Sequence, residues 1–88
     1  MTLRIERQFD GGRPVLRVSG RIAAENLQEL KAEAQGMKVG TVLDLEHVTL
    51  VDVDGVRFLC ACQADGMELL HCSPYIREWM MRERMNRG

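Results

Sequence analysis

The sequence of 88 residues contains no long apolar run. A membrane-spanning helix needs roughly 20 consecutive apolar residues, and no run in this sequence approaches that length. The first residues also lack the apolar stretch of a secretory signal peptide. We therefore expect a cytoplasmic protein that does not insert into a membrane.

A broad excess of basic residues is missing as well, because the formal net charge is −1. Residues 1–21 contain five arginines against two acidic residues, whereas residues 22–72 contain nine acidic residues against three basic ones. Proteins that bind nucleic acids usually present a basic surface to the phosphates. The acidic middle of the chain therefore argues against a nucleic-acid partner.

Cysteine is scarce, and the three cysteines do not follow the spacing of a disulfide-rich scaffold. We expect Cys60, Cys62 and Cys72 to be reduced thiols. A zinc site built from Cys60, Cys62 and the pair His71-Cys72 is disfavoured, because residues two positions apart on a helix point about 200° apart. We expect neither a metal nor another cofactor.

The sequence also lacks a pattern that predicts catalysis. His47, His71 and Ser73 do not stand in a recognisable order of nucleophile and base, and no glycine-rich phosphate-binding loop is present. We expect His47 to lie on a surface loop and His71 on the last strand of a sheet. The chain is therefore not expected to be an enzyme.

The residues that are present predict a small folded domain. Hydrophobic residues make up 45% of the sequence and charged residues 28%, which is typical of a globular chain. A chain of this length closes one core, so we expect residues 1–88 to form a single domain.

Hydrophobic periodicity predicts the order strand, strand, helix, strand, helix, strand, helix. Strand–helix–strand units favour parallel neighbours, so the order predicts an α/β fold with a small mixed four-stranded sheet that begins with an antiparallel hairpin. The expected elements are strands at 3–9 and 14–19, a helix at 23–35 that Gly36 ends in a left-handed conformation, a strand at 41–45, a loop at 46–47 leading along 48–51, a helix at about 54–64, a strand at 67–72 and a helix at 74–86.

The most specific segment lies between the third strand and the second helix. It places Asp52 and Asp54 at a helix N-terminus, where free N–H groups and the helix dipole favour negative charge by ~0.3–1 kcal/mol. Helix capping by either carboxylate explains this pattern without any further function. Asp54 and Arg57 are also spaced to form an ion pair on the helix surface.

With this segment in view, the sequence resembles the STAS domain family, the module of bacterial anti-sigma-factor antagonists and of the cytoplasmic tails of sulfate transporters. The resemblance spans about residues 15–79. It implies a sheet covered by helices mainly on one face, and a regulatory role in bacterial signalling and transcription. The residues that carry it are Leu16-Arg17-Val18-Ser19-Gly20, Val42-Leu43-Asp44-Leu45, Asp52-x-x-Gly55-Val56 and Ser73-Pro74.

Two positions depart from the family pattern. Family members commonly have a hydroxyl residue just before the glycine, and a partner serine kinase, the anti-sigma factor, phosphorylates it. Here that residue is Asp54, which a serine kinase cannot phosphorylate, so the usual switch is absent or altered. Family members also favour an aspartate where this chain has Ala23. Another hydroxyl, that of Thr49 or Ser73, remains open as a phosphorylation site.

Asp54 therefore has three interpretations. It is a permanent mimic of phosphoserine, a fixed part of an unregulated docking surface, or a helix cap in a chain that kept the fold and lost the switch. We favour the second and third, because a mimic locked in the non-binding state would need another task.

We expect a non-catalytic module that binds a protein, and the resemblance implies a serine-kinase-type anti-sigma factor as a candidate partner. Asp54 would set the local charge, Gly55 would allow close backbone approach, and Arg57 would offer a cation. The exposed side of the same helix would complete the surface. The predicted partner-binding residues are Asp52, Val53, Asp54, Gly55 and Arg57.

The final helix is a second candidate surface. Its residues Ile76, Trp79 and Met80 are predicted to pack on the sheet, which leaves another apolar set exposed: Tyr75, Met81 and Met85. Methionine-rich surfaces recur at protein contacts. An alternative function is therefore a scaffold or homo-oligomer subunit that assembles through this helix. A third is a small-ligand or nucleotide sensor, which the resemblance implies because some family members are credited with such binding.

Overall fold

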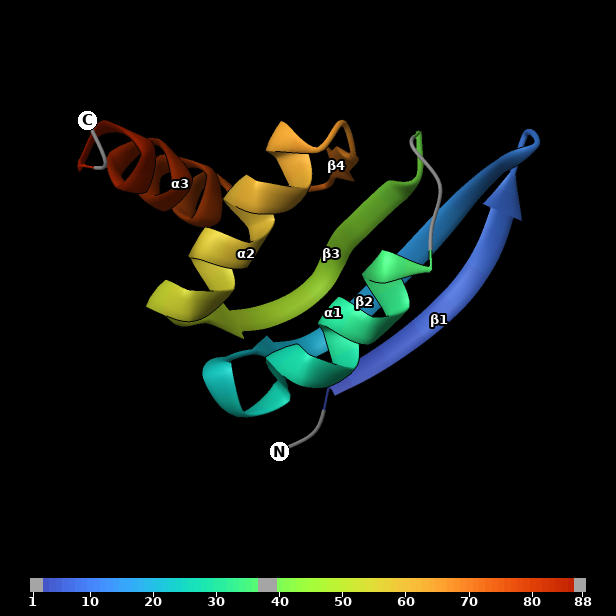
Figure 1. Ribbon diagram of the computed structural model, residues 1–88, viewed down its shortest axis with the longest axis horizontal. Helices are drawn as coiled ribbons and strands as arrows, with labels where there is room; N and C mark the ends of the chain where they lie inside the picture. Colours follow the sequence, from blue (N-terminus) through green and yellow to red (C-terminus); the bar gives the residue numbers. More distant parts are fainter. Residues whose placement is uncertain (1–2, 37–39, 87–88) are drawn as a thin grey trace.

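Four strands form one mixed sheet in the computed structural model, which describes residues 3–36 and 40–86. Strands β1 and β2 are antiparallel, whereas β2 with β3 and β3 with β4 are parallel. This arrangement confirms the predicted α/β fold. The strands follow one another across the sheet (Figure 1) as β1 (Leu3–Asp10), β2 (Arg13–Ile22), β3 (Val42–Val51) and β4 (Glu68–Leu70).

A two-residue turn connects β1 and β2, because Asp10 pairs with Arg13 across the hairpin. The turn residues Gly11 and Gly12 have φ values of 62° and 85°. A two-residue hairpin with positive φ at both central positions matches the natural twist of the strands, and glycine adopts this backbone without a steric cost.

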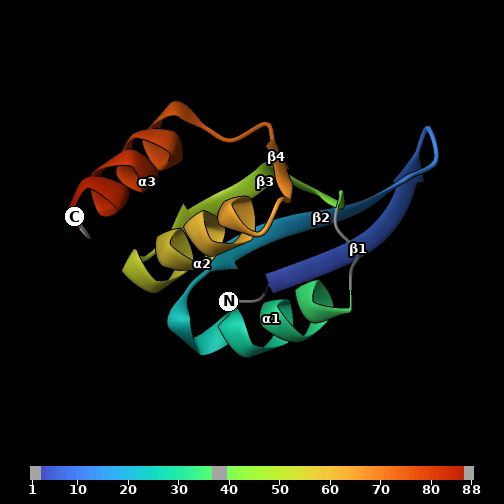
Figure 2. The same ribbon diagram turned by 45° about the horizontal axis from the view of Figure 1, so that its top comes forward.

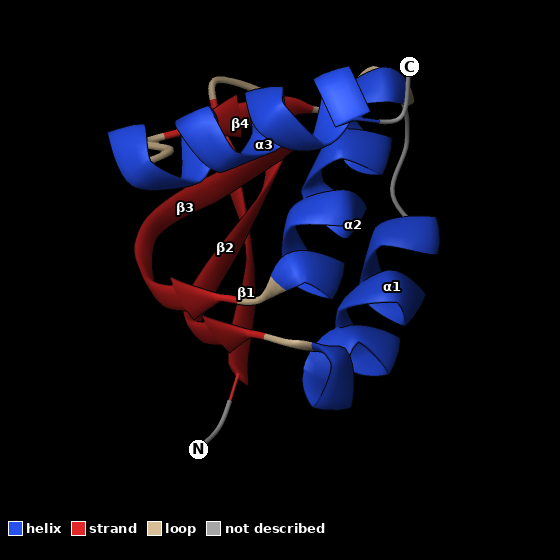
Figure 3. Ribbon diagram, turned by 90° about the vertical axis from the view of Figure 1, so that its left-hand side faces the viewer, coloured by secondary structure: helices blue, strands red, loops and turns tan. Residues whose placement is uncertain are grey.

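The helices lie mainly on one face of the sheet, as expected. Figure 3 shows α1 and α2 side by side on that face, and Figure 2 shows α2 between α1 and α3. Within the described ranges, no helix is both long and apolar enough to cross a bilayer. The helical elements are the 3-10 helix η1 (Ala24–Asn26) and the α-helices α1 (Leu27–Gln35), α2 (Val53–Ala64) and α3 (Pro74–Asn86).

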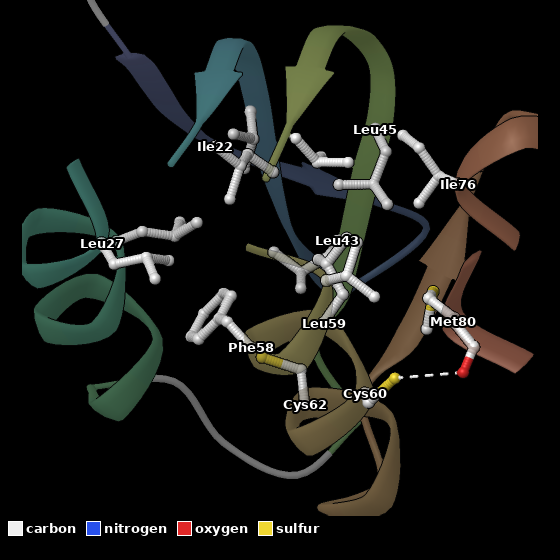
Figure 4. Close-up of a cluster of buried hydrophobic side chains, with 14 of the residues drawn as sticks. Ile22, Leu27, Leu43, Leu45, Phe58, Leu59, Cys60, Cys62, Ile76 and Met80 are labelled. Carbon is white, nitrogen blue, oxygen red and sulfur yellow. Dashed lines mark hydrogen bonds between the residues drawn. The ribbon is translucent and has the colours of Figure 1, made fainter. Parts of the chain in front are cut away.

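The hydrophobic core fills the space between the sheet and these helices (Figure 4). From α3, Ile76 and Met80 are buried and Trp79 packs against the core, which confirms the predicted inner stripe of this helix. Ser73 starts α3 as predicted, because its Oγ accepts the Ile76 N–H at 3.3 Å. The fully buried side chains include Leu16, Val18, Ile22, Leu30, Leu43, Val56 and Leu59.

Three strands differ from the sequence prediction. The second strand, predicted at 14–19, continues to Ile22. The predicted loop at 46–47 is wrong, because β3 continues without a break to Val51 and pairs with β2 through register shifts. The last strand ends at Leu70 rather than at Cys72, because His71 has a φ of 57° and turns the chain away from the sheet. His71 therefore does not lie on a strand.

The first helix also differs at both ends. The predicted helix at 23–35 begins with the 3-10 turn, and its α-helical part starts only at Leu27. Gly36 has a φ of −80°, so the predicted left-handed end of this helix is wrong. The second helix agrees with its prediction to within one residue.

Gly55 is the glycine on which the packing of α2 depends. It is buried in the first turn of the helix, and a Cβ added there would lie 2.4 Å from the carbonyl oxygen of Ile22. That oxygen is fixed, because it accepts the Asp52 N–H at 3.2 Å. The absence of a side chain at this position lets α2 start directly against the end of β2.

We expect Gly55→Ala to lower the free energy of unfolding by about 1–3 kcal/mol, because the added methyl group must displace backbone. Gly36→Ala is the matched control, since its Cβ would meet only the Glu33 carbonyl oxygen at 3.7 Å. The control should be neutral or slightly stabilising. Urea unfolding followed by circular dichroism measures both, and equal effects would contradict the close-approach argument.

Candidate functional site

The predicted site lies at the N-terminus of α2, where Asp52 joins two parts of the fold. Its Oδ1 accepts the Gly55 N–H at 2.8 Å, which caps α2, and its Oδ2 accepts the Ala24 N–H at 3.0 Å at the start of η1. Burial would raise the pKa of Asp52, but the hydrogen bonds from backbone N–H groups outweigh it and lower the pKa below its usual value. Asp52 therefore acts as an ionised connector between the two helical segments.

Asp54 is exposed, and its carboxylate has no ion pair or hydrogen bond with any described residue. The predicted pair between Asp54 and Arg57 is wrong. Arg57 Nε instead lies 3.1 Å from Glu83 Oε1 on α3, and the Glu83 side chain is only 14% exposed. Because α3 packs against α2, it brings a largely buried carboxylate to Arg57 and leaves the Asp54 carboxylate free.

A groove of about 390 Å³ lies beside Asp54, between α1 and α2, and we call it the α1–α2 groove. Leu27 and Phe58 lie between the two helices and form part of its apolar floor (Figure 4). Lys31 lines the groove together with Asp54, and Lys31 also forms no ion pair within the described part of the chain. The residues that line the groove are Ala24, Leu27, Gln28, Lys31, Asp54, Arg57, Phe58 and Ala61.

The structure distributes the five predicted residues between surface and interior. Val53, Asp54 and Arg57 are exposed, whereas Asp52 is half-buried and Gly55 is buried. Asp54 and Arg57 both line the α1–α2 groove, although they do not pair with each other. The residues that α1 contributes to the groove were not predicted from the sequence, because no local pattern reveals that α1 lies beside α2.

Three further positions singled out from the sequence have structural contacts. Ala23 is buried, and its carbonyl accepts the Asn26 N–H at 2.8 Å. Thr49 Oγ1 donates a hydrogen bond to the carbonyl of Gly20 at 3.1 Å. The Ser73 hydroxyl caps α3, as described above.

A second polar cluster lies on the opposite face of the sheet, where Asp44 is only 5% exposed. Its Oδ1 lies 3.0 Å from His71 Nδ1 and accepts the Glu46 N–H at 3.0 Å, while Arg17 Nε lies 3.6 Å from its Oδ2. Burial alone would raise the pKa of Asp44. The hydrogen bonds and the nearby charges have the larger effect, so the pKa lies below its usual value. The hydrogen bond to Asp44 and its negative charge raise the pKa of His71.

Within the ranges that the structure describes, one group could offer three metal ligands: Asp44, Glu46 and His71, whose ligand atoms lie within 4.8 Å of one another. The Asp44 carboxylate is already engaged by His71 and Arg17, so the cluster is explained as an ion-pair network.

The cysteines have no role in that group. Cys60 and Cys62 are buried, and the Cys60 thiol contacts the Met80 carbonyl at 3.7 Å (Figure 4). Burial and the charge of Asp65 raise the pKa of Cys62 to about 11. The Cys62 thiol is therefore protonated near neutral pH and is a poor nucleophile.

Comparisons with known proteins agree with the sequence and the geometry. The family model described as "Mlab, STAS domain" matches residues 5–70. The solved structure of the anti-sigma factor antagonist SpoIIAA in its unphosphorylated form aligns with a TM-score of 0.68 at 17% identity, covering 98% of this chain and 96% of that one. A structure of Mglu aligns with a TM-score of 0.51 at 25% identity, and the match covers 78% of this chain but only 19% of Mglu. A search of the curated proteins gave no match.

We expect Asp52→Ala to lower the free energy of unfolding by about 0.5–2 kcal/mol, because it removes the cap of α2 and the link to η1. Asp54→Ala is the matched control, since it removes a carboxylate from the same turn that accepts no hydrogen bond from any described residue. Its cost should be smaller. Thermal melts of the two variants make the comparison, and a larger loss in Asp54→Ala would show that the wrong carboxylate has been assigned as the cap.

The ion pair of Asp44 with His71 predicts a pH-dependent stability. Because the pKa of His71 is raised in the fold, the stabilisation is fully present below the unfolded pKa of about 6.5 and is lost as pH rises through the folded pKa. The part due to the lowered pKa of Asp44 is lost at the acidic end, as pH falls through the folded pKa of Asp44.

The test compares the melting temperature of the wild type with that of His71→Asn from pH 5 to 9. Asparagine tolerates positive φ, so this variant preserves the local backbone while removing the titrating ring. The wild type should lose its advantage over the variant at the alkaline end. A constant difference across the range would mean that the pair does not control stability.

Proposed function

The chain belongs to the STAS domain family, and from this premise we propose that it is a non-catalytic regulatory module that acts by binding another protein. Residues 1–88 form one domain, and it works in the bacterial cytoplasm. Its partner is a serine-kinase-type anti-sigma factor, in keeping with the likeness of its fold to SpoIIAA. The partner docks on the α1–α2 groove and the adjoining start of α2.

The α1–α2 groove is the observation that carries this proposal. It combines an apolar floor at Leu27 and Phe58 with one charge of each sign, at Lys31 and Asp54, that forms no ion pair among the described residues. Protein interfaces pair a desolvated apolar centre with complementary charges, which give register and specificity. A partner segment that inserts an apolar side chain, with an acidic group facing Lys31 and a basic group facing Asp54, would match this groove.

The contacts of Asp52 help to decide among the interpretations of Asp54. Asp52 already caps α2, so capping does not account for the carboxylate of Asp54. Asp54 also carries about one negative charge, compared with −1.5 to −2 for a phosphate group. These two facts favour Asp54 as a fixed part of the docking surface, in which binding is not switched by phosphorylation at this position.

A second candidate function rests on the exposed side of α3. Tyr75, Met81 and Met85 are 61%, 58% and 77% exposed, which is unusual for large apolar side chains. Trp79 packs edge-on against Tyr75, with ring centroids 5.8 Å apart. Assembly of a scaffold or homo-oligomer through this helix is the alternative to binding a kinase partner.

We expect Asp54→Arg to weaken binding to the kinase-type anti-sigma factor by about tenfold or more, because it places a cation where the partner presents one. The partner is first captured from the native lysate on wild-type chain and identified by mass spectrometry. Calorimetry with the purified partner then measures the affinity of each variant.

Glu29→Arg provides the matched control, since it reverses an exposed charge on α1 outside the groove lining. Its affinity should equal that of the wild type. Asp54→Ala and Asp54→Ser serve as further baits, and stronger capture by them would show that the natural carboxylate weakens docking. Unchanged affinity of Asp54→Arg would place the interface elsewhere, and recovery of this chain alone on every bait would favour the scaffold.

A further inference from the structure

Strand β1 forms a border of the sheet, and its outer edge pairs with no strand in the described part of the chain. Figure 1 shows β1 running along the outside of the sheet beside β2. The strand is eight residues long and contains neither proline nor a register shift along its pairing with β2. Such an edge presents unpaired backbone N–H and C=O groups that can pair with another strand.

The side chains of β1 alternate between the two faces of the sheet. Leu3 and Ile5 pack at the margin of the hydrophobic core, so Arg4 and Glu6 belong to the opposite face. Both of these charged residues are exposed, and neither forms an ion pair with a described residue. The outer strand therefore has two free opposite charges, two positions apart on one face.

This charge pattern is self-complementary in one antiparallel register. If Ile5 lies on the two-fold axis between two copies, Arg4 faces Glu6 of the second copy, and Glu6 faces Arg4 of the second copy. Side chains directly opposite each other across antiparallel strands share a face and interact. The same register places Ile5 against Ile5 of the second copy, on the face that carries the helices.

The neighbouring two-fold registers bring like charges together. An axis at Arg4 would set two arginines against each other, an axis at Glu6 would set two carboxylates against each other, and an axis at Arg7 would again pair arginines. Like charges directly opposite are destabilising. Among these registers, only the one centred on Ile5 pairs opposite charges at both contacts and also sets two isoleucines against each other.

We propose that two copies of this chain pair through β1, antiparallel and centred on Ile5, so that their sheets join into one continuous sheet. The partner on this edge is therefore a second copy of the chain. The α1–α2 groove takes no part in this contact, so the pairing does not rest on the function proposed above.

Complementary charge variants test the pairing. Sedimentation of the wild type at increasing concentration should show a dimer. Arg4→Glu and Glu6→Arg should each sediment as monomers, because each variant sets like charges against each other at both contacts. An equimolar mixture of the two variants should form a heterodimer, since every contact then joins opposite charges again.

Glu29→Arg is the control for a charge reversal away from the edge, and it should dimerise like the wild type. A wild type that stays monomeric at every concentration, or a mixture that does not associate, would overturn the proposal. Disulfide crosslinking tests it without altering a charge: under oxidation Ile5→Cys should form a covalent dimer, whereas Gln8→Cys should not. Absence of the Ile5→Cys dimer, or equal crosslinking of both variants, would also overturn it.

Discussion

The carboxylate of Asp52 is the contact on which the arrangement of the helices depends. One of its oxygens caps α2 and the other binds the first N–H of η1, while its own N–H donates to Ile22 at the end of β2. Three segments that are distant in sequence therefore meet at one residue. Because the chain leaves β2 and β3 at this point, α1 and α2 begin close together, and the α1–α2 groove is a consequence of that origin.

Within a single turn of helix, two residues hold the fold together and a residue between them is exposed. Asp52 is ionised, and both of its carboxylate oxygens accept backbone N–H groups. Gly55 permits α2 to approach the Ile22 carbonyl closely. Asp54 lies between them in sequence but is exposed and unpaired within the described residues. A position freed from capping can carry whichever charge a partner requires. Under the proposed docking, a carboxylate in place of the family's hydroxyl would alter recognition without disturbing the fold.

The two faces of the sheet are stabilised by different interactions. The face under the helices is apolar, and it forms one hydrophobic core with side chains from the helices. On the other face, the nearly buried Asp44 is compensated by Arg17 and by His71, which ties the segment after β4 back to β3. A buried carboxylate without such partners would be costly. The turn at His71 thus places its imidazole beside Asp44, and this ion pair links the end of β4 to β3.

Local patterns in the sequence determined the hairpin with its two glycines, the order of the elements, the inner stripe of α3 and its cap at Ser73. Each depends on residues a few positions apart, so periodicity and turn chemistry reveal them. The conformation of Gly36 and the length of β3 were not predicted correctly, because the end of a helix or a strand depends on its tertiary contacts. Only the tertiary structure decided that Arg57 pairs with Glu83, that His71 reaches Asp44, and that Lys31 faces the same groove as Asp54. The residues of each pair lie more than twenty positions apart, and they come near each other only after the sheet and helices have packed together.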